Sequence, residues 1–315
     1  RIDNVFHSPI ELKKIMESPL FGTIPYLEQI TNILEDDNKD NLSEKNKFIY
    51  EESFRYLFNS IKSKNVNNKD SKVFTVTSSI PSEGKNVISI LLSKIIASMD
   101  QKILLIDADM RKPNLHNDLN LKNDFGLSDI LLGNIDLWEK GVQVYQDNKF
   151  LEIITAGSIY KDPPRLLSDN NFGNFIERIK KKNNYDYIII NNTPLLGLTD
   201  AILVAENSDS VLLAVSINKV DRNLVKESIF RLSRNSKVNF LGVIANYLER
   251  YEYEYYGYSK DLNYSDTYLK YSSENEEFSD ETNKNENKIS IFIRKNKYIK
   301  TFYKNIYKFI RWLNK

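Results

Sequence analysis

The sequence contains no cysteine and only two histidines, His7 and His116. The lack of cysteine excludes disulfides and thiolate metal sites and is typical of a reducing compartment. Two histidines are too few for a histidine-rich zinc site. No stretch approaches the roughly 18 apolar residues that a membrane-spanning helix needs. The chain begins with Arg1 and not Met, so we expect it to be a piece of a longer protein, whose missing part has room for a membrane segment.

Excess charge of one sign is also missing, because 44 Lys and Arg stand against 43 Asp and Glu. A net charge of +1 gives no overall positive field, so we expect no nucleic-acid partner. Hydrophobic residues make up 41% of the 315 residues, which is enough for a substantial core.

Short apolar runs alternate with longer helical stretches from about residue 71 to residue 246. The runs are "KVFTVT" (72–77), "KILLID" (102–107), "LEIIT" (151–155), "YDYIIIN" (185–191), "SVLLAVS" (210–216) and "FLGVIAN" (240–246). The helical stretches lie near 85–99, 165–182, 199–207 and 221–234. This alternation predicts an α/β fold with a mainly parallel, doubly wound sheet. Ligands of such sheets bind at the carboxyl ends of the strands.

Two more helices are expected before the first core strand. Ser8 as N-cap, Pro9 at the first helical position and Glu11 at the third predict a short helix that buries Leu12 and Met16. Residues 31–46 are polar and are interpreted as a linker. A longer helix is predicted near 47–62, with Phe48, Phe54, Leu57, Phe58 and Ile61 on its apolar face.

The stretch "SSIPSEGKNVIS" (78–89) follows the first core strand and begins the first long core helix. Backbone N–H groups and the helix N-terminus converge on an anion in this context, Gly84 allows close approach, and Lys85 can reach the β and γ phosphates. A Gly-Lys pair after a strand also arises by chance or for packing. This stretch alone does not decide between the two.

Acidic and amide residues end two further core strands. "ILLIDADMRKPNLH" (103–116) carries Asp107 and Asp109, which can hold Mg²⁺ or its waters and accept a hydroxyl proton. The same pair also suits a simple turn. "YDYIIINNTPLLGLTDA" (185–201) places Asn191 where an ATPase normally has a metal-holding Asp.

Together, "TSSIPSEGKN", "LLIDADMRKP" and "YDYIIINNTP" resemble the bacterial tyrosine kinases of the Wzc and CapB type, a P-loop NTPase group related to MinD and ParA. "FGLSDILLGN" (125–134) and "ITAGSIYKDPPRLL" (154–167) resemble further family segments, and "SPIELKKIMESPLFGTIP" resembles the segment after the second transmembrane helix of full-length members. The resemblance covers about residues 5–270. It implies a juxtamembrane-like segment and linker over 1–46 and a nucleotide-binding domain over 47–246.

The resemblance implies roles for individual residues, with ATP and Mg²⁺ as cofactors. The implied nucleotide contacts are Ser82, Glu83, Gly84, Lys85, Asn86 and Asn246. Asp107, Asp109 and Lys85 are the implied catalytic residues, and Asn86, Asp107, Asp109 and Asn191 stand at the metal positions. Glu52 and Arg55 match the start of the motif through which family members form rings.

Three residues depart from the family pattern. Asn86 replaces the hydroxyl residue that binds Mg²⁺, Asn191 replaces a carboxylate, and Phe58 replaces the last Arg of the ring motif. Asn carries no charge, so we expect phosphoryl transfer to be slowed by roughly 10²–10⁴-fold. Nucleotide binding is expected to survive, because Gly84 and Lys85 remain. Phe58 weakens the expectation of a ring.

Residues 247–271 contain nine of the 19 tyrosines and have no period that could bury a face, so they are interpreted as a mobile tail. By resemblance this tail enters a neighbouring subunit's site. The expected phosphoacceptors are Tyr251, Tyr253, Tyr255, Tyr256, Tyr258, Tyr264, Tyr268 and Tyr271. The Asn, Lys, Ile and Tyr bias of an AT-rich genome is an alternative source of the tyrosines. Residues 272–288 continue the tail as an acidic stretch.

Residues 289–315 are basic, and apolar residues recur there at helical spacing. The pattern predicts an amphipathic helix. It can attach to an anionic inner membrane leaflet, where each Lys or Arg adds about 1 kcal/mol, or it can pack on the domain or a partner. The sequence does not decide between these.

Three functions remain as hypotheses. The leading one is an ATP-binding tyrosine autokinase-like domain that regulates exopolysaccharide or capsule synthesis at the cytoplasmic face of the bacterial inner membrane. Its expected partners are other copies of the chain, a membrane polysaccharide co-polymerase segment in the same or a separate chain, and a candidate tyrosine phosphatase. The second is an inactive or weak relative that acts as an interaction module. The third is a MinD-like or ParA-like membrane-associated ATPase, which the tyrosine-rich tail argues against.

Overall fold

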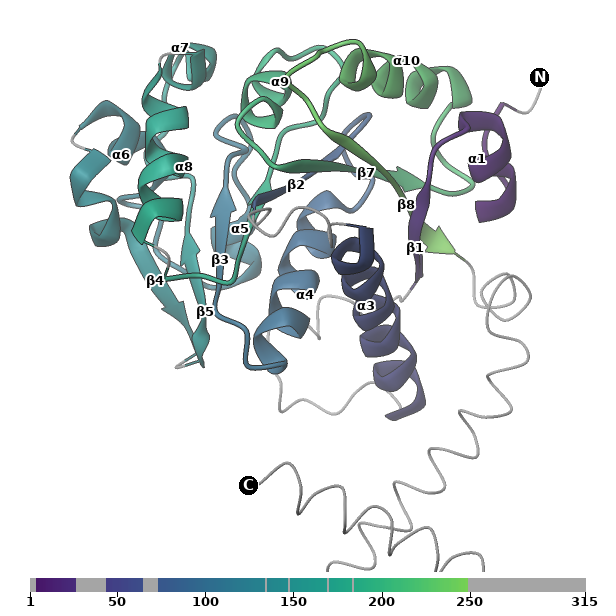
Figure 1. Ribbon diagram of the computed structural model, residues 1–315, viewed down its shortest axis with the longest axis horizontal. Coiled ribbons are helices and arrows are strands. Elements are labelled where there is room, and N and C mark those ends of the chain that lie inside the picture. Colours follow the sequence, from purple (N-terminus) through teal and green to yellow (C-terminus); the bar gives the residue numbers. More distant parts are fainter. Residues whose placement is uncertain are drawn as a thin grey trace, which may run out of the picture. The chain divides into compact units, whose positions relative to one another are not determined.

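The apolar runs form strands of one eight-stranded sheet in the computed structural model (Figure 1). The structure describes residues 4–26, 44–64, 73–133, 135–146, 148–168, 170–182 and 184–248. All of these belong to one compact unit of the chain, residues 1–257. Tyr247 and Leu248, the first two residues of the predicted mobile tail, instead end the last strand of the sheet. The rest of the predicted tyrosine tail and the basic helix lie outside the described residues.

The strand order is β1-β8-β7-β2-β6-β3-β5-β4. Six strands correspond to the predicted runs: β2 (Val73–Ser78), β3 (Ile103–Asp107), β5 (Asn148–Ile154), β6 (Tyr187–Asn191), β7 (Ser210–Ser216) and β8 (Phe240–Leu248). All pairings are parallel except that between β5 and β4. The mainly parallel sheet is therefore confirmed.

Two strands were not predicted, and they form the two ends of this sheet. β1 (Leu20–Pro25) pairs in parallel with β8, so the segment before the polar linker extends the sheet. β4 (Val142–Tyr145) pairs antiparallel with β5 and is half exposed. Half-exposed edge strands lack the long apolar run that marks a central parallel strand, which explains why the pattern missed β4.

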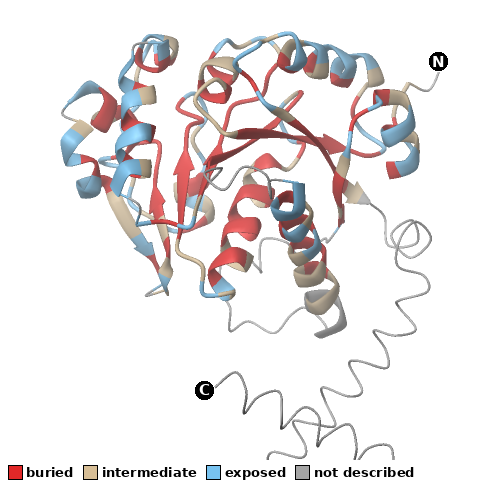
Figure 2. Cartoon of the chain, in the orientation of Figure 1, coloured by how far each residue is buried: buried red, intermediate tan, exposed pale blue. Residues whose placement is uncertain are grey.

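Helices cover both faces of the sheet (Figure 1). On one side, α3 (Glu44–Lys64) and α4 (Lys85–Ser98) pack their apolar faces with Phe74, Val76 and Leu105 of the strands. The remaining described elements are α1 (Pro9–Met16), α5 (Leu115–Asp118), α6 (Leu127–Leu132), the 3₁₀ helix η1 (Ile135–Gly141), α7 (Pro163–Ser168), α8 (Asn170–Lys182), α9 (Asp200–Ala205) and α10 (Arg222–Ser233). Helix α8 packs with Val73, Leu104 and Ile188, which point to the opposite side of the sheet. Strands β2, β3 and β7 are buried along their whole length (Figure 2), as a doubly wound fold requires of its central strands.

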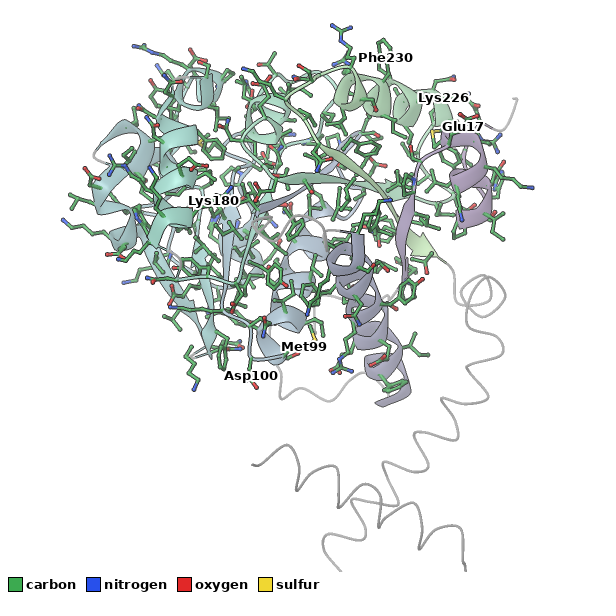
Figure 3. All side chains as sticks on the ribbon, in the orientation of Figure 1. Glu17, Met99, Asp100, Lys180, Lys226 and Phe230 are labelled. Atoms are coloured by element: carbon green, nitrogen blue, oxygen red, sulfur yellow. The ribbon has the colours of Figure 1, made fainter. Side chains whose placement is uncertain are left out.

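The helix predicted over 165–182 is two helices, α7 and α8. Helix α8 is tied to the turn before β7 by an ion pair between Lys180 Nζ and Asp209 Oδ1 at 3.0 Å (Figure 3 labels Lys180). This contact helps fix α8 against the sheet.

The predicted N-terminal helix is present as α1. Ser8 is its N-cap and accepts a hydrogen bond from the Glu11 N–H at 3.1 Å, while Pro9, Leu12 and Met16 are buried. The capping prediction is confirmed. Among the described residues, none of the helices has the length and apolar character that crossing a membrane requires.

Helix α3 carries the residues that resemble the ring motif. Arg55 pairs with Glu52 at 2.5 Å and with Glu51 at 3.2 Å along its own helix. Phe58 is only 4% exposed and packs edge-on against Tyr187, with ring centroids 5.0 Å apart. Phe58 therefore belongs to the core, and an arginine at this position would bury its charge.

Gly126 precedes α6 at a point of close backbone approach. The N–H groups of Leu127 and Ser128 bond to the carbonyls of Thr155 and Ala156, at 2.8 and 2.9 Å. A Cβ on Gly126 would lie 2.5 Å from the backbone nitrogen of Gly157, well inside van der Waals contact. Only glycine fits between these segments.

We expect Gly126→Ala to lower the free energy of unfolding by about 1–3 kcal/mol, because backbone must move to admit the methyl group. Gly133→Ala is the matched control, since its Cβ would meet one carbonyl oxygen at 3.1 Å. Chemical denaturation measures both. Equal stability of the two variants would contradict the packing account.

Candidate nucleotide-binding site

The loop between β2 and α4 has the backbone of a phosphate loop. Gly84 is the N-cap of α4 with φ of 90°, and Ser82 also has a positive φ of 67°. A Cβ on Gly84 would collide with the side-chain amide of Asn246. Glycine is therefore required at position 84 both for its φ and for space. The N-terminus of α4 opens at the carboxyl end of β2, where an anion would be favoured.

The carboxyl-terminal parts of β7 and β8 hold this loop in place. The buried Glu83 carboxylate accepts hydrogen bonds from the Ile80 N–H at 2.8 Å and the Ser216 N–H at 3.2 Å. The Asn246 side-chain amide donates to the Glu83 carbonyl at 2.9 Å. Strands β7 and β8 thus fix the shape of the loop. The side chains of Glu83 and Asn246 therefore form hydrogen bonds to other parts of the protein.

Burial raises the pKa of Glu83 to about 7, against the lowering effect of its backbone hydrogen bonds and of Lys219. Between its ordinary value of 4.5 and about 7, the folded protein binds this proton more tightly than the unfolded chain does. The Glu83 contribution to the free energy of unfolding therefore falls as pH rises through this window.

We expect Glu83→Gln to remove about 2–3 kcal/mol of the stability difference between pH 5 and pH 8, because glutamine does not titrate. Denaturant unfolding across this range measures it. Glu227→Gln, at an exposed position on α10, serves as the control. A profile for Glu83→Gln as steep as that of the unmodified chain would contradict the assignment.

Lys85 lies at the first position of α4 and points into the site. Its Nζ is 2.7 Å from Asp109 Oδ2 and 2.8 Å from Asn86 Oδ1. The ion pair is nearly enclosed, with side-chain exposures of 10% for Lys85 and 7% for Asp109. Lys85, which is expected to bind phosphate, is thus held in an ion pair by Asp109, which follows β3.

Asp107 and Asn191 stand side by side, because β3 and β6 are neighbours in register at these residues. The Asn191 amide donates to Asp107 Oδ1 at 3.0 Å and to Asn86 Oδ1 at 3.2 Å. Asp107 Oδ2 is buried and has no hydrogen-bond partner among the described residues. Burial raises the pKa of Asp107 to about 6, opposed by the Asn191 hydrogen bond and by Lys85.

The structure adds three residues that the sequence did not single out. Asp118, on α5, hydrogen-bonds the Asn86 side chain, and its pKa is raised by burial. Asp200 holds Arg111 through two hydrogen bonds, of 2.6 and 3.0 Å. The Tyr247 hydroxyl lies beside Gly84, and its ring packs edge-on against Tyr26.

Only one of these three residues could have been found from the sequence. Tyr247 directly follows the predicted Asn246, so its place could be found from the sequence. No sequence pattern connects Asp118 with Asn86, or Asp200 with Arg111, because short helices and loops bring these residues together. The predicted residues Lys85, Asn86, Asp107, Asp109 and Asn191 do meet in one place.

The site fits a nucleotide phosphate better than it fits a resident magnesium ion. The loop supplies a helix N-terminus and Lys85 for phosphate. Asp107 Oδ2 could meet a cation or one of its waters, but Asp109 Oδ2 and Asn86 Oδ1 are directed at Lys85. The described residues contain no cluster of three or more His, Cys, Asp or Glu side chains suited to a metal.

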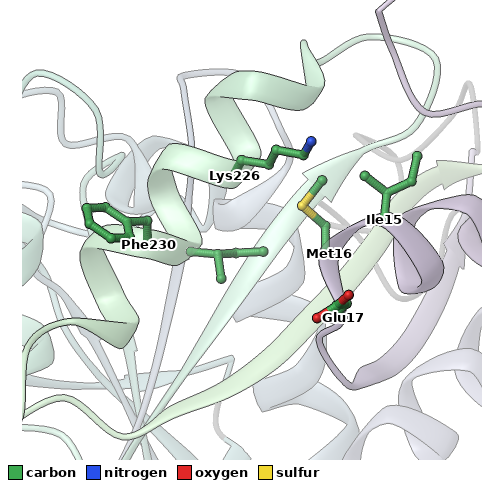
Figure 4. Close-up of a pocket in the computed structure, with 6 residues that line it drawn as sticks. Ile15, Met16, Glu17, Lys226 and Phe230 are labelled. Carbon is green, nitrogen blue, oxygen red and sulfur yellow. The ribbon is translucent and has the colours of Figure 1, made fainter.

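A separate pocket of about 240 Å³ lies between α1 and α10 (Figure 4). It is lined by Ile15, Met16, Glu17, Lys226, Ile229 and Phe230. Its lining includes no residue of the loop, and none of Asp107, Asp109 and Asn191 at the ends of β3 and β6. This pocket is not the nucleotide site.

Comparison with known proteins assigns the family. Residues 71–226 match the family model described as an AAA domain. The tyrosine-protein kinase YwqD of Bacillus subtilis (strain 168) is 30% identical over 212 residues, which cover 67% of this chain and 87% of that protein. The chain belongs to the bacterial tyrosine-protein kinase family. Nucleotide binding by a P-loop is part of this family assignment.

Two further comparisons define how far the bacterial tyrosine-protein kinase likeness extends. Tyrosine-protein kinase Etk of Escherichia coli (strain K12) is 32% identical over 177 residues, but these cover only 24% of that protein. The solved kinase domain of E. coli tyrosine kinase ETK matches with a TM-score of 0.66 and 26% identity, over 75% of this chain and 94% of that domain. The chain therefore corresponds to the kinase domain and spans about a quarter of full-length Etk.

Proposed function

We propose that the chain binds ATP at the Gly84–Lys85 loop and serves as a tyrosine autokinase-like domain that regulates exopolysaccharide or capsule synthesis. One observation carries the proposal. Lys85, at the N-terminus of α4, meets Asp109 beside Asp107 at the carboxyl end of β3, and Gly84 directly before it has the positive φ of a phosphate loop. Relatives named tyrosine-protein kinases support the assignment.

In this proposal, Lys85 exchanges its ion pair with Asp109 for the β and γ phosphates. That exchange frees the Asp109 carboxylate, and Asp107 or Asp109 then accepts the proton of a tyrosine hydroxyl. The raised pKa of Asp107, about 6, makes it a better base than an ordinary aspartate while leaving it ionised at neutral pH. Mg²⁺ would arrive on the nucleotide, with Asp107 as the available carboxylate, and would supply neutralisation of phosphate charge.

The acceptor tyrosines and the partners belong to the same proposal. We propose the division into 1–46, 47–246, 247–288 and 289–315, with the tail tyrosines as acceptors presented to a second copy of the chain. The ring contact would use Glu52 and Arg55. A membrane co-polymerase segment, a tyrosine phosphatase and anionic inner-leaflet lipid are the other proposed partners, at the cytoplasmic face of the membrane.

The test is incubation with Mg·ATP followed by mass spectrometry of residues 247–271. We expect phosphotyrosine to form slowly and to be absent from a Lys85→Ala control. Tyrosine phosphate that accumulates equally in both chains would show that the loop is not the source. No phosphate in either chain favours the second candidate.

The second candidate is a catalytically inactive interaction module. The amide network of Asn86 and Asn191 favours it, because uncharged side chains occupy both metal-side positions. Such a module would bind nucleotide without transferring phosphate.

A further inference from the structure

Asn86 has its side-chain amide committed to protein partners. Its Oδ1 accepts from Lys85 Nζ at 2.8 Å and from Asn191 Nδ2 at 3.2 Å, and its side chain also hydrogen-bonds Asp118. A Ser or Thr side chain is shorter and carries its donor and its acceptor sites on a single atom, so it does not reach these three partners from separate atoms as the Asn86 amide does. Asn86 thus joins α4 to β6 and α5 and offers no spare oxygen to a cation.

Asn191 completes the connection on the neighbouring strand. Its Nδ2 donates to Asp107 Oδ1 at 3.0 Å as well as to Asn86, and its Oδ1 faces Ser89 Oγ at 3.4 Å. Two amide hydrogens therefore lie between α4 and the Asp107 carboxylate. A divalent cation with its waters would otherwise be needed to bridge oxygens at such a place.

The charge count of the site points the same way. With Asn at position 191, Asp107 and Asp109 lie near the expected phosphates and Asp118 lies beside Asn86, while Lys85 pairs with Asp109. An aspartate at 191 would add one more anion, directly next to Asp107. Less negative charge in the site weakens the repulsion of a nucleotide that carries no magnesium.

We infer that this site binds nucleoside di- and triphosphates almost independently of a divalent cation, because the Asn86–Asn191 amide pair takes the structural place of the cation. The inference rests on the proposed function, since it concerns the same loop. The inference treats nucleotide binding and phosphate transfer as separate steps. The nucleotide binds without a metal ion, but transfer remains slow because no metal ion neutralises the charge on the phosphates.

The experiment titrates ADP into the full chain by calorimetry, once with excess Mg²⁺ and once with EDTA. We expect the two dissociation constants to agree within about threefold. The Asn86→Thr/Asn191→Asp variant should instead bind at least about tenfold more tightly with Mg²⁺ than with EDTA. Asn117→Asp, which adds a negative charge at an exposed position of α5, is the matched control and should behave like the unmodified chain.

Each outcome has a distinct meaning. Binding by the unmodified chain that strengthens more than about tenfold with Mg²⁺ would overturn the inference and leave the proposed function standing. No binding in either buffer would overturn both. If the double variant does not fold, the single Asn86→Thr and Asn191→Asp variants carry the same comparison, and a shift of their melting temperatures by Mg²⁺ with ADP is a second readout.

Discussion

Restoring the two metal-side groups, by Asn86→Thr with Asn191→Asp, is expected to raise the rate of tyrosine phosphorylation by about 10²–10⁴-fold. The reason is chemical. A metal ion stabilises the negative charge that develops during phosphoryl transfer. Position 86 lies in the first turn of α4 and position 191 is the last residue of β6, where that ion would be held. Asp107 already supplies a buried carboxylate oxygen without a partner among the described residues.

The measurement is phosphotyrosine formation in residues 247–271 over time, by mass spectrometry, in both chains. The same two substitutions should also make the nucleotide-free protein less stable. An aspartate at position 191 would place a second carboxylate where Asn191 Nδ2 now lies 3.0 Å from Asp107 Oδ1. Equal rates in the unmodified and restored chains would refute the view that these two asparagines limit transfer.

Removing the loop cation is expected to have the second largest effect. Lys85→Ala should weaken ADP binding by at least about 100-fold, which corresponds to a loss of about 2.7 kcal/mol of binding free energy. It should also lower the free energy of unfolding by about 3–5 kcal/mol, because Asp109 would remain buried without its partner.

A double variant separates these two losses. Lys85→Ala with Asp109→Ala removes both partners of the ion pair, so much of the stability should return while nucleotide binding stays lost. Calorimetry measures the affinity and denaturant unfolding measures the stability. Recovery of nucleotide binding in the double variant would mean that Lys85 acts only through folding.

Much of the fold could be predicted from sequence because central parallel strands leave a strong signal. Runs such as "SVLLAVS" are buried on both faces in β7, and the N-cap at Ser8 is set by neighbouring residues alone. β1 could not be found in this way. It contains Gly22 and Pro25, and its position depends on pairing with β8, more than 200 residues later in the chain.

For the site, the sequence predicted which residues gather but not how they face one another. Strand ends bring Asp107 and Asn191 together by register, which the order of motifs implied. The orientation of the Asn191 amide toward Asp107, and the contact of Asp118 with Asn86, depend on packing between separate elements. Because of those contacts, we interpret Asn86 and Asn191 as a hydrogen-bonded link between α4 and β6, and not simply as positions that have lost their metal ligands.

Titration of ADP into the chain, beside the Lys85→Ala/Asp109→Ala variant, is the most direct test of the claim that this loop is a working nucleotide site. The account predicts saturable binding to the unmodified chain, with one nucleotide per chain, and no detectable binding to the variant at the same concentrations. Absence of binding to the unmodified chain, or equal binding to both chains, would contradict it.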